Sequence, residues 1–374
     1  MTYLIVCSGT AGHINPGLCI AEEIKSRLPD SEIIFIGTGR ELEKRLIPEA
    51  GFKLINIKMS GIKRGIKPSD IIYNIKTVIN VLAAKKTVKK LLKNTKPEAV
   101  IGTGGYICYP VIKAAAKMKI PTFIHESNAM PGMSVKMLSA VADKVMISFE
   151  GYDRYYKKPQ RLVLTGTPLK KEFYTSIEET GIQQKEGKPL VVSFWGSLGS
   201  ERMNEIMAGF IKRNIEDKSF YHIHATGNSF DVLTQKLAEN NITEFKPPYA
   251  DIREYINDMP VVMSKADLVI CRAGAITITE LLTLGKPSII IPSPYVPDNV
   301  QQENAKQLEQ IGAAIVIEES LCNDSLLYET TKKLILNTNK LDEMAQAAKK
   351  LTKSNATVEI VDLIQKCVQE QRRG

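Results

Sequence analysis

The sequence lacks several features that define other large classes of protein. No stretch approaches ~20 uncharged apolar residues, the length that crosses a membrane as a helix, and no charged segment precedes the short apolar run at the N-terminus. We therefore expect neither a transmembrane helix nor a signal peptide. The chain also has no pair of aspartates in a DxD pattern, and we expect no metal and no cofactor.

Cysteine is scarce and scattered. The cysteines form no CxxC pair, and most of them lie in or beside apolar segments. This pattern is typical of reduced core residues in a cytoplasmic protein and argues against a disulfide framework or a cysteine zinc site. The six cysteines are residues 7, 19, 108, 271, 322 and 367.

The composition that remains is that of a soluble globular protein with two domains. The chain has 374 residues, of which 44% are hydrophobic and 24% charged. The net charge of +9 is unevenly shared, because residues 1–168 contain 26 basic and 13 acidic residues whereas the remainder contains 24 and 28. A basic half beside a mildly acidic half suggests that only one domain faces an anionic partner.

Short apolar segments that lead into glycine turns alternate with helical segments along the chain. This alternation predicts two doubly wound α/β domains. In the first half we expect strands at 2–7, 32–36, 52–57, 99–101, 121–124 and 144–148, the last of its sheet, and helices at 16–28 and 69–94. Pro16 suits a first helical position, and residues 150–168 resemble an interdomain linker. In the second half we expect strands at 189–194, 220–224, 267–271 and 288–292, and a helical end at 341–373 that could pack across both domains.

Three polar stretches follow strands of the first predicted sheet. They are GTAGH at 9–13, GTGGY at 102–106 and HESN at 125–128. Ligands of such sheets bind at the carboxyl ends of the strands, and glycine lets the backbone approach them closely. His13 falls where a helix begins, and a histidine there can act as a general base. A turn histidine, a tight crossover turn at 102–106 and a plain surface loop at 125–128 are the alternatives left open.

The second half carries two strand–turn–helix units of the same kind. These are WGSLGS at 195–200 and CRAGAITITE at 271–280, the latter followed by a strand and the pair Gln301–Gln302. A helix N-terminus favours an anion, so Ser197 and the turn at 272–274 could hold a diphosphate while Glu280 reaches sugar hydroxyls. This combination fits a nucleotide-sugar site. An ordinary βαβ core unit with a surface glutamate, and a serine that only caps its helix, remain open.

The segment from 68 to 96 combines an apolar stripe with a lysine-rich end. Apolar residues recur at helical spacing from Ile71 to Leu82, and five lysines follow at 85, 86, 89, 90 and 93. Such a helix can rest on an anionic membrane surface. A core-facing helix with a solvated lysine face is the alternative. Aromatic residues are not interleaved with the lysines, Tyr73 excepted, which argues against a nucleic-acid groove.

With these stretches collected, the chain resembles the MurG family, bacterial peptidoglycan glycosyltransferases of the GT-B fold, along nearly its whole length. The resemblance implies two Rossmann-like doubly wound domains that face a central cleft. An acceptor and membrane-associating domain would span 1–165, completed by a C-terminal helix at 351–374, and a donor domain would span 166–350. The matching stretches are GTAGHINPG at 9–17, GTGGY at 102–106, HESNAMPG at 125–132, GSLGS at 196–200, CRAGAITITE at 271–280 and DNVQQENA at 298–305.

The resemblance also implies an activity. Such an enzyme is an inverting hexosyltransferase that moves N-acetylglucosamine from UDP-N-acetylglucosamine to undecaprenyl-pyrophosphoryl-N-acetylmuramoyl-pentapeptide (lipid I), giving lipid II in peptidoglycan synthesis. The implied partners are these two substrates, the anionic inner-leaflet surface and other cell-wall synthesis proteins, with no nucleic acid. The implied location is the cytoplasmic face of the cell membrane, in peripheral association.

Site residues follow from the resemblance position by position. His13 is the preferred general base and Glu126 a weaker candidate. The substrate-binding positions are Thr10, Ala11 and Gly12 for the donor sugar and acceptor diphosphate; Asn128, Gln301 and Gln302 for the donor sugar; Ser197, Ala275, Ile276 and Thr277 for the donor diphosphate; Ile256, which would pack on the uracil and bond it through its backbone; Glu280 for the ribose; and Lys170 as a positive charge.

The chain departs from the family pattern at five positions. Ala11 and Trp195 stand where glycine is usual, and Leu198 stands where glutamine is common. Thr167 and Lys170 replace an asparagine and, in some members, an arginine; a lysine cannot make the bidentate contact of an arginine. Trp195 and Leu198 leave the structure of the predicted diphosphate turn undecided.

Three rival functions share this fold or donor. They are glycosyl transfer to diacylglycerol, epimerisation of UDP-N-acetylglucosamine without a lipid acceptor, and nucleotide binding by a non-enzymatic adaptor of cell-wall assembly. The absence of a DxD pair agrees with a mechanism in which helix N-terminal amides, rather than a metal, stabilise the leaving diphosphate.

Overall fold

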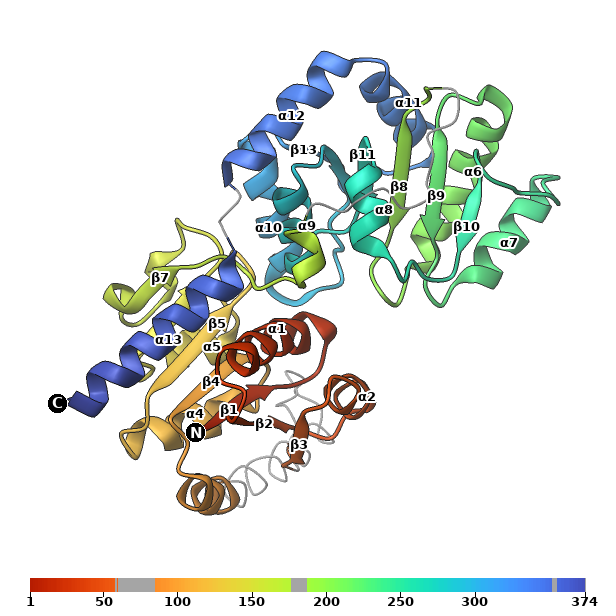
Figure 1. Ribbon diagram of the computed structural model, residues 1–374. Helices are drawn as coiled ribbons and strands as arrows, with labels where there is room; N and C mark the ends of the chain where they lie inside the picture. The colour runs from red at the N-terminus through yellow and green to blue at the C-terminus, as the bar shows by residue number, and fades with distance from the viewer. Residues whose placement is uncertain (58, 60–84, 176–186, 352–354, 374) are drawn as a thin grey trace, which may run out of the picture. The chain divides into compact units, whose positions relative to one another are not determined.

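The described part of the chain forms two compact units. The computed structural model describes residues 1–57, 59, 85–175, 187–351 and 355–373. The first unit comprises Met1–Lys170 and Lys353–Gly374, and the second comprises Lys171–Thr352 (Figure 1). The C-terminal segment therefore belongs to the same unit as the N-terminus.

Among the described residues, the sheet of the first unit has seven parallel strands in the order β3-β2-β1-β4-β5-β6-β7. From β1 the chain adds strands on one side as far as β3 and then continues on the other side with β4. This reversal places a topological switch point, where ligands of such sheets bind, between β1 and β4. The strands are β1 Thr2–Cys7, β2 Glu32–Gly37, β3 Lys53–Asn56, β4 Ala99–Gly104, β5 Thr122–Glu126, β6 Lys144–Ile147 and β7 Leu162–Leu164.

Helices pack against this sheet through buried aliphatic side chains. Ile360 and Ile364 of the last helix, α13, lie in one core cluster with Ile20 and Ile24 of α1, which attaches the C-terminal helix to the first unit (Figure 1). The helices are α1 Ala11–Arg27, α2 Glu41–Glu49, α4 Cys108–Lys117, α5 Met133–Leu138 and α13 Ala356–Arg373, with short 3-10 turns η1 Asp153–Tyr155 and η2 Pro159–Arg161. Residues 85–95 are also helical.

The second unit repeats the architecture with six described strands in the order β10-β9-β8-β11-β12-β13, all parallel. Its switch point lies between β8 and β11. The strands are β8 Leu190–Phe194, β9 Tyr221–Ala225, β10 Asp251–Arg253, β11 Leu268–Cys271, β12 Ser288–Ile290 and β13 Ala314–Val316. The helices are η3 Lys171–Phe173, α6 Glu201–Asp217, α7 Phe230–Glu239, α8 Met259–Lys265, α9 Ala275–Leu284, η4 Pro297–Asn299, α10 Val300–Gln310, α11 Asp324–Ile335 and α12 Thr338–Leu351.

The prediction of two doubly wound α/β domains is confirmed, and several local predictions are wrong. Helix α1 begins at Ala11, so Pro16 lies inside the helix instead of opening it. The supposed linker contributes a seventh strand, β7, to the first sheet, because Val163 pairs with Met146 of β6. Strands β10 and β13 were not predicted, and the helical end is divided into α12 and α13.

Two further predictions concern the whole chain. The cysteines are free thiols, buried except for the half-buried Cys367. None of the described helices is long and apolar enough to cross a membrane. Most of the predicted helix at 69–94, including its apolar stripe, lies outside the described residues.

Candidate active site

The turns after β1, β4 and β5 lie at one edge of the first sheet, because these strands are neighbours. The Ser8 amide donates to Gly104 O at 3.2 Å, and Thr103 Oγ1 donates to His13 O at 2.7 Å. The stretches at 9–13 and 102–106 are therefore in direct contact, and the stretch at 125–128 follows the adjacent strand. The edge brings together most of the first-half residues that the sequence predicts.

His13 is held in one orientation. Its Nδ1 lies 2.8 Å from Ser8 O; because a carbonyl oxygen only accepts, Nδ1 carries a proton, and the neutral ring therefore has its lone pair on Nε2. The half-buried ring packs on Gly104, where a Cβ would lie 2.2 Å from His13 Cδ2 and where φ is +135°. Gly104 is thus needed for the imidazole to lie where it does. The arrangement suits a general base that acts through Nε2.

The beginning of α1 offers backbone donors beside this histidine. Thr10 is the N-cap, and the amides of His13 and Ile14 both donate to Thr10 O. The amides of Ala11 and Gly12 precede these first helical hydrogen bonds, as at any helix N-terminus. Thr10 is exposed and the next two residues are half-buried, so this turn can approach an anionic or hydroxylated ligand.

Glu126 is held by its own loop. The carboxylate is 6% exposed. Its Oε1 accepts from the Asn128 amide and from Asn128 Nδ2, both at 3.0 Å, and its Oε2 accepts from the Gly132 amide at 2.8 Å. These contacts suit a residue that positions Asn128, and they make Glu126 less suited than His13 to remove a proton. Its neighbour His125 is buried, and burial lowers the pKa of this imidazole to about 4.

In the second unit, the turn between β8 and α6 presents Ser197. Gly196 and Gly199 both have positive φ, at +84° and +77°, so the chain reverses tightly and leaves Ser197 exposed. A Cβ on Gly199 would lie 2.0 Å from Thr226 O, so this turn packs directly on the one after β9. Trp195 is buried beneath the turn and Leu198 is exposed at its tip; neither departure blocks Ser197.

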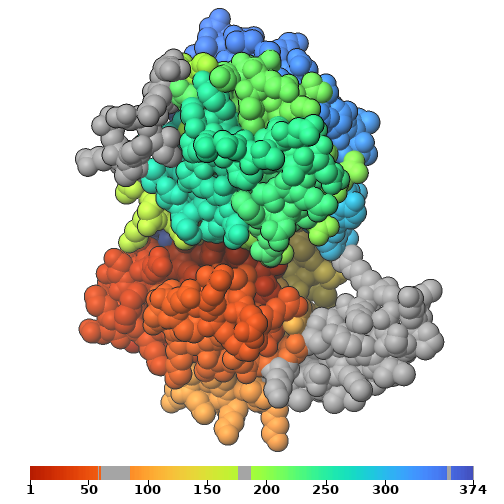
Figure 2. Space-filling view, turned by 90° about the vertical axis from the view of Figure 1, so that its right-hand side faces the viewer, coloured from red at the N-terminus to blue at the C-terminus, as the bar shows by residue number. Residues whose placement is uncertain are grey.

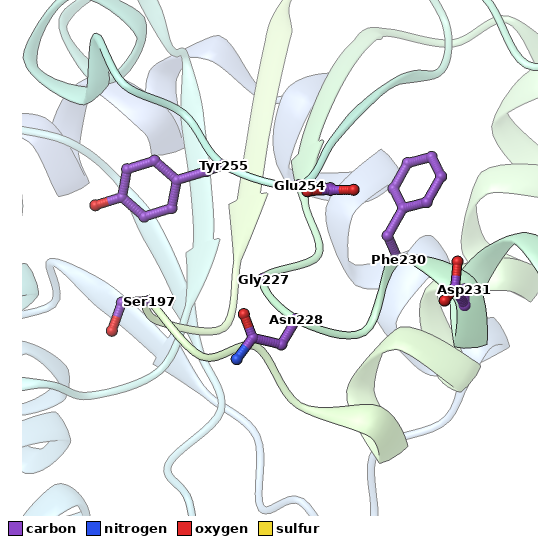
Figure 3. Close-up of a pocket in the computed structure, with 7 residues that line it drawn as sticks. All are labelled: Ser197, Gly227, Asn228, Phe230, Asp231, Glu254 and Tyr255. Atoms are coloured by element: carbon purple, nitrogen blue, oxygen red, sulfur yellow. The ribbon is translucent and has the colours of Figure 1, made fainter. Parts of the chain in front are cut away.

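Ser197 borders a pocket of about 300 Å³ at the ends of β8, β9 and β10. Figure 3 shows that the lining residues come from the turns after β8, β9 and β10 and from the first residues of α7. The lining residues are Ser197, Gly227, Asn228, Phe230, Asp231, Glu254 and Tyr255. A hydroxyl, an amide and an aromatic ring around one pocket can bind a polar, ring-containing ligand.

Ile256 does not present its side chain to this pocket. It is 2% exposed and packs inside the unit, so only its backbone could contact a base. The preceding Tyr255 is 59% exposed and lines the pocket. The sequence indicated the right loop, but which of two adjacent residues faces outward depends on how that loop packs.

The CRAGAITITE stretch folds as its pattern predicts. Helix α9 begins at Ala275 with Gly274 as N-cap, and its first hydrogen bond runs from Ile278 N–H to Gly274 O at 2.9 Å. The amides of Ala275, Ile276 and Thr277 precede that bond and can serve an anion. Glu280 is half-buried on the same helix, and its charge contributes to raising the pKa of the buried Cys271 thiol, after the larger effect of burial.

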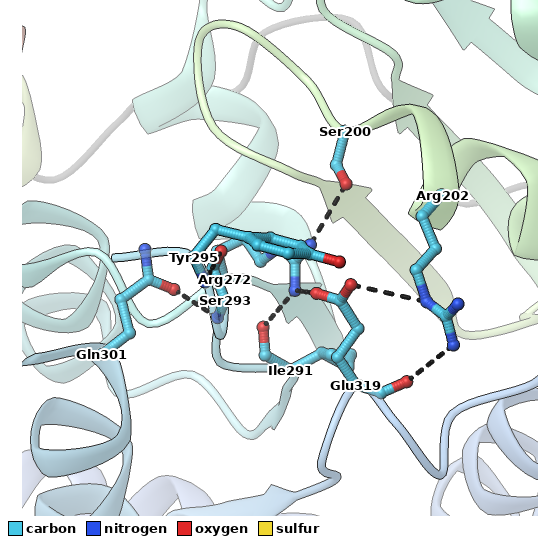
Figure 4. A network of polar contacts seen from close by, with 8 residues as sticks. All are labelled: Ser200, Arg202, Arg272, Ile291, Ser293, Tyr295, Gln301 and Glu319. Carbon is cyan, nitrogen blue, oxygen red and sulfur yellow. Dashed lines mark hydrogen bonds and ion pairs between the residues drawn. The ribbon is translucent and has the colours of Figure 1, made fainter. Parts of the chain in front are cut away.

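Arg272 forms a buried ion pair that the sequence did not predict, and it also contacts the other glycine turn of this unit (Figure 4). Arg272 Nη1 lies 2.6 Å from Glu319 Oε2 and donates to Ile291 O at 3.1 Å, and Arg272 Nη2 donates to Ser200 Oγ at 3.1 Å. The guanidinium also lies 5.8 Å from the centre of the Trp195 ring. Arg272 belongs to the predicted motif, but no local pattern marks Glu319 as its partner.

The glutamine pair divides between two tasks. Gln301 Oε1 accepts from the Ser293 amide at 2.8 Å, so Gln301 fixes the loop after β12 (Figure 4). Gln302 Oε1 is buried and accepts no hydrogen bond among the described residues. An unpaired buried acceptor is costly, and a ligand hydroxyl would satisfy it. Gln302 is therefore the better candidate for a sugar contact.

The remaining predicted cations are exposed. Lys170, the last residue of the first unit, has an exposed side chain. In the helix at 85–95 the five lysines are exposed, whereas Val88 and Leu92 are buried in the core of the first unit. Figure 2 shows the orange atoms of this part of the chain projecting at the bottom of the first unit's surface.

Comparison with known proteins shows which family the chain belongs to. The glycosyltransferase family 28 N-terminal domain matches residues 3–147, and the family 28 C-terminal domain matches residues 190–360. The chain belongs to glycosyltransferase family 28. It is a glycosyltransferase of the GT-B fold, and each of the two matched domains supplies one of its α/β units.

Relatives within family 28 are similar over the full length. The UDP-N-acetylglucosamine–N-acetylmuramyl-(pentapeptide) pyrophosphoryl-undecaprenol N-acetylglucosamine transferase of Acetivibrio thermocellus is 44% identical, with 100% of both chains covered. The transferase of the same name from Caldanaerobacter subterraneus subsp. tengcongensis is 41% identical, covering 97% of this chain and 99% of the relative. Within glycosyltransferase family 28, the chain belongs to the family of these N-acetylglucosamine transferases.

Solved structures show the same fold. The crystal structure of Acinetobacter baumannii MurG matches with a TM-score of 0.75 and 28% identity, covering 98% of this chain and 100% of that one. The UDP-GlcNAc 2-epimerase of Neisseria meningitidis bound to UDP-GlcNAc matches with a TM-score of 0.63 and 14% identity, covering 98% and 100%. At that identity the epimerase shares the fold alone.

Proposed function

We propose that this chain transfers N-acetylglucosamine from UDP-N-acetylglucosamine to lipid I, forming lipid II with inversion at the anomeric carbon. The observation that carries the proposal is the His13 side chain, which is fixed by Ser8 O and Gly104 so that Nε2 keeps its lone pair at the switch-point edge of the first sheet. The full-length similarity to transferases named for this donor and acceptor supports it.

The proposed reaction is a single displacement. His13 Nε2 takes the proton from the acceptor hydroxyl, whose oxygen attacks the anomeric carbon. The bond from that carbon to the diphosphate oxygen breaks, and UDP leaves with the electron pair. Glu126 acts through its hold on Asn128, which contacts the donor sugar. Thr10, Ala11 and Gly12 line the same edge and approach the sugar and the acceptor diphosphate.

In this proposal, the second unit holds UDP. Charge that builds on the leaving diphosphate is stabilised by Ser197 and by the first amides of α9, at Ala275, Ile276 and Thr277. Tyr255 and the backbone at Ile256 receive the uracil. Glu280 binds the ribose of UDP-N-acetylglucosamine, and Gln302 binds its sugar. Gln301 supports the neighbouring loop, and Lys170 contributes a positive charge.

The direct test is an assay of the purified protein with UDP-N-acetylglucosamine and lipid I, in which lipid II and UDP should appear in equal amounts. Transfer to diacylglycerol with none to lipid I would contradict the choice of acceptor. Release of UDP or isomerisation of the sugar without any lipid acceptor would favour the epimerase reaction instead. UDP binding without turnover would favour an adaptor.

We further propose that the chain binds peripherally to an anionic inner-leaflet membrane surface through the lysines of residues 85–95. Lys85, Lys86, Lys89 and Lys90 are exposed on a helix whose Val88 and Leu92 are buried, so the basic face can meet a membrane without disturbing the core. Each basic residue near such a surface contributes about 1 kcal/mol. We also propose that the chain associates with other proteins of cell-wall synthesis.

Replacing those four lysines by glutamine should therefore weaken binding to vesicles that contain anionic lipid by about 100-fold or more. A control variant neutralises four exposed lysines of the second unit, Lys246, Lys333, Lys340 and Lys350. Co-sedimentation with vesicles measures both variants. Equal binding of the two variants would contradict the membrane assignment.

A further inference from the structure

Glu43 is a buried carboxylate that the proposed chemistry does not use. It lies in the first turn of α2, is 0% exposed, and points its oxygens at the loop between β2 and α2. Oε2 accepts from the amides of Thr38, Gly39 and Arg40 at 2.7, 2.8 and 3.3 Å. A glutamate that reaches back to the amides before its own helix is a common N-terminal capping arrangement.

Capping does not explain the other oxygen. Glu43 Oε1 accepts from Thr38 Oγ1 at 2.9 Å and from the Gly9 amide at 3.0 Å. Gly9 belongs to the turn after β1, 34 residues earlier in the chain, and it immediately precedes Thr10, the N-cap of α1. The carboxylate therefore ties the turn that carries His13 to the loop at 38–40.

The surrounding backbone is built to admit this contact. A Cβ on Gly37 would lie 2.5 Å from Glu43 Oε2, so a larger residue there would displace the carboxylate. Gly9 has φ of +98°, a conformation that lets its amide turn toward Oε1. The two oxygens of Glu43 together accept five hydrogen bonds, which a carboxylate can do. A side-chain amide in the same place could not, because its nitrogen donates hydrogen bonds instead of accepting them.

His13 depends on the peptide units that this contact fixes. The imidazole Nδ1 is oriented by Ser8 O, the carbonyl of the peptide bond whose N–H is that of Gly9. The two groups lie in one rigid plane. Fixing the Gly9 amide on Glu43 therefore fixes the direction of Ser8 O, and Ser8 O selects the tautomer of His13.

We propose that Glu43 is a positioning residue for the reaction, acting on His13 through the Ser8–Gly9 peptide. The chain of contacts runs from Glu43 Oε1 to Gly9 N–H, across the peptide plane to Ser8 O, and on to His13 Nδ1. This inference rests on the proposed function, in which His13 is the base. It assigns Glu43 no contact with either substrate.

The test compares Glu43→Gln with Glu41→Gln. Both remove one charge from the first turn of α2, but Glu41 is exposed and pairs with Lys44 at the surface. In Glu43→Gln the single carbonyl oxygen cannot serve both groups of donors, so the Gly9 amide or the 38–40 loop loses its acceptor. We expect kcat to fall about 10- to 100-fold, as for a small displacement of a catalytic group. The KM for UDP-N-acetylglucosamine should stay within about twofold of wild type, since its proposed ligands lie mainly in the second unit.

Hydrogen exchange gives a readout that needs no turnover. In the wild-type protein, a peptide covering residues 8–13 should contain a slowly exchanging amide, and its exchange should accelerate in Glu43→Gln but not in Glu41→Gln. Thr38→Val, which removes one donor and keeps the carboxylate, should lower kcat only a few-fold. If Glu43→Gln does not fold, the hydrogen exchange of the wild-type protein and the kcat of Thr38→Val still test the proposed role of Glu43.

Three results would overturn the assignment: a kcat for Glu43→Gln equal to that of Glu41→Gln, a parallel rise in the donor KM that accounts for the loss, or unchanged exchange at residues 8–13. Failure of the proposed function looks different. In that case the wild-type protein makes no lipid II, while hydrogen exchange still reports whether Glu43 holds the turn.

Discussion

At the residue scale, the clearest assignment is the division of labour between His13 and Glu126. Both follow strands of the same sheet edge, and both are residue types that can take a proton. Glu126 accepts three hydrogen bonds from its own loop, whereas His13 uses Nδ1 for Ser8 O and keeps Nε2 for a substrate. These hydrogen bonds, not the residue types, are the reason why we propose His13 as the base and Glu126 as a positioning group.

Replacing His13 by alanine should lower kcat by about 10²- to 10⁴-fold, the usual contribution of a general base. His13→Asn should be nearly as inactive, because its Nδ2 can still donate to Ser8 O but it offers no basic nitrogen. The dissociation constant of UDP should change little in either variant. Steady-state kinetics and calorimetry measure the two quantities, and full activity in His13→Asn would remove His13 from the role of base.

Glu280→Ala should weaken binding of the donor substrate and leave binding of the acceptor unchanged. Loss of hydrogen bonds from a charged group to ribose hydroxyls costs about 1.5–3 kcal/mol, which corresponds to roughly a 10- to 100-fold rise in the donor KM. The KM for lipid I should remain at the wild-type value. Initial rates with each substrate varied in turn provide the check; an unchanged donor KM would count against the ribose contact.

At the element scale, Arg272 links the two glycine turns of the second unit through its hydrogen bond to Ser200, and Glu319 supplies its counter-charge. Arg272 leaves the end of β11 and contacts Ser200, which caps α6, while Glu319 follows β13. Side chains of Arg272 and Glu319 are 8% and 3% exposed. The pair thus connects three loops at the carboxyl edge of the sheet, and it lies beneath the turn that presents Ser197.

Glu319→Leu should destabilise the second unit by about 3–5 kcal/mol, because it leaves Arg272 buried without its counter-charge. Arg202→Gln is the matched control: Arg202 contacts the same carboxylate at 3.4 Å but its side chain is 51% exposed, so its loss should cost no more than ~1 kcal/mol. Denaturant unfolding followed by fluorescence measures both. Equal destabilisation would contradict the importance of the buried pair.

At the scale of the whole molecule, buried histidines make stability depend on pH. His222 and His224 share the hydroxyl of Ser193, with His222 Nε2 and His224 Nδ1 at 2.8 and 2.7 Å from its Oγ. Burial lowers the pKa of His224 to about 3, and burial together with the neighbouring His224 lowers the pKa of His222 well below its usual value. His125, in the first unit, has its pKa lowered to about 4.

These histidines are neutral in the folded protein and gain protons on unfolding below their ordinary pKa of about 6.5. Since the unfolded state binds more protons, stability is complete above that pH and falls as the pH is lowered toward the folded pKa values. Between pH 7.5 and 5.5 each histidine should cost about 1 kcal/mol of unfolding free energy. Thermal unfolding at both pH values tests this, and an unchanged midpoint would contradict it.

Much of the fold was predictable from local pattern. Buried parallel strands are continuous apolar runs, so β1, β2, β8 and β11 were located within a residue or two, and glycine turns marked where they end. Strands β7, β10 and β13 have three residues each and were not predicted, whereas the equally short β12 was predicted as part of the run at 288–292. Helix α1 begins at Ala11, before Pro16, with Thr10 in the N-cap position.

The sequence by itself determined the two doubly wound domains and the segments that carry chemistry, because alternating apolar runs and glycine turns are local signals. It also indicated His13, Ser197, Glu280 and the glutamine pair, which lie in recognisable stretches. Only the tertiary structure decided that Tyr255 and not Ile256 faces the pocket, that Arg272 pairs with Glu319, and that Glu43 holds Gly9. These contacts join residues distant in the chain or depend on loop packing, and no local pattern encodes them.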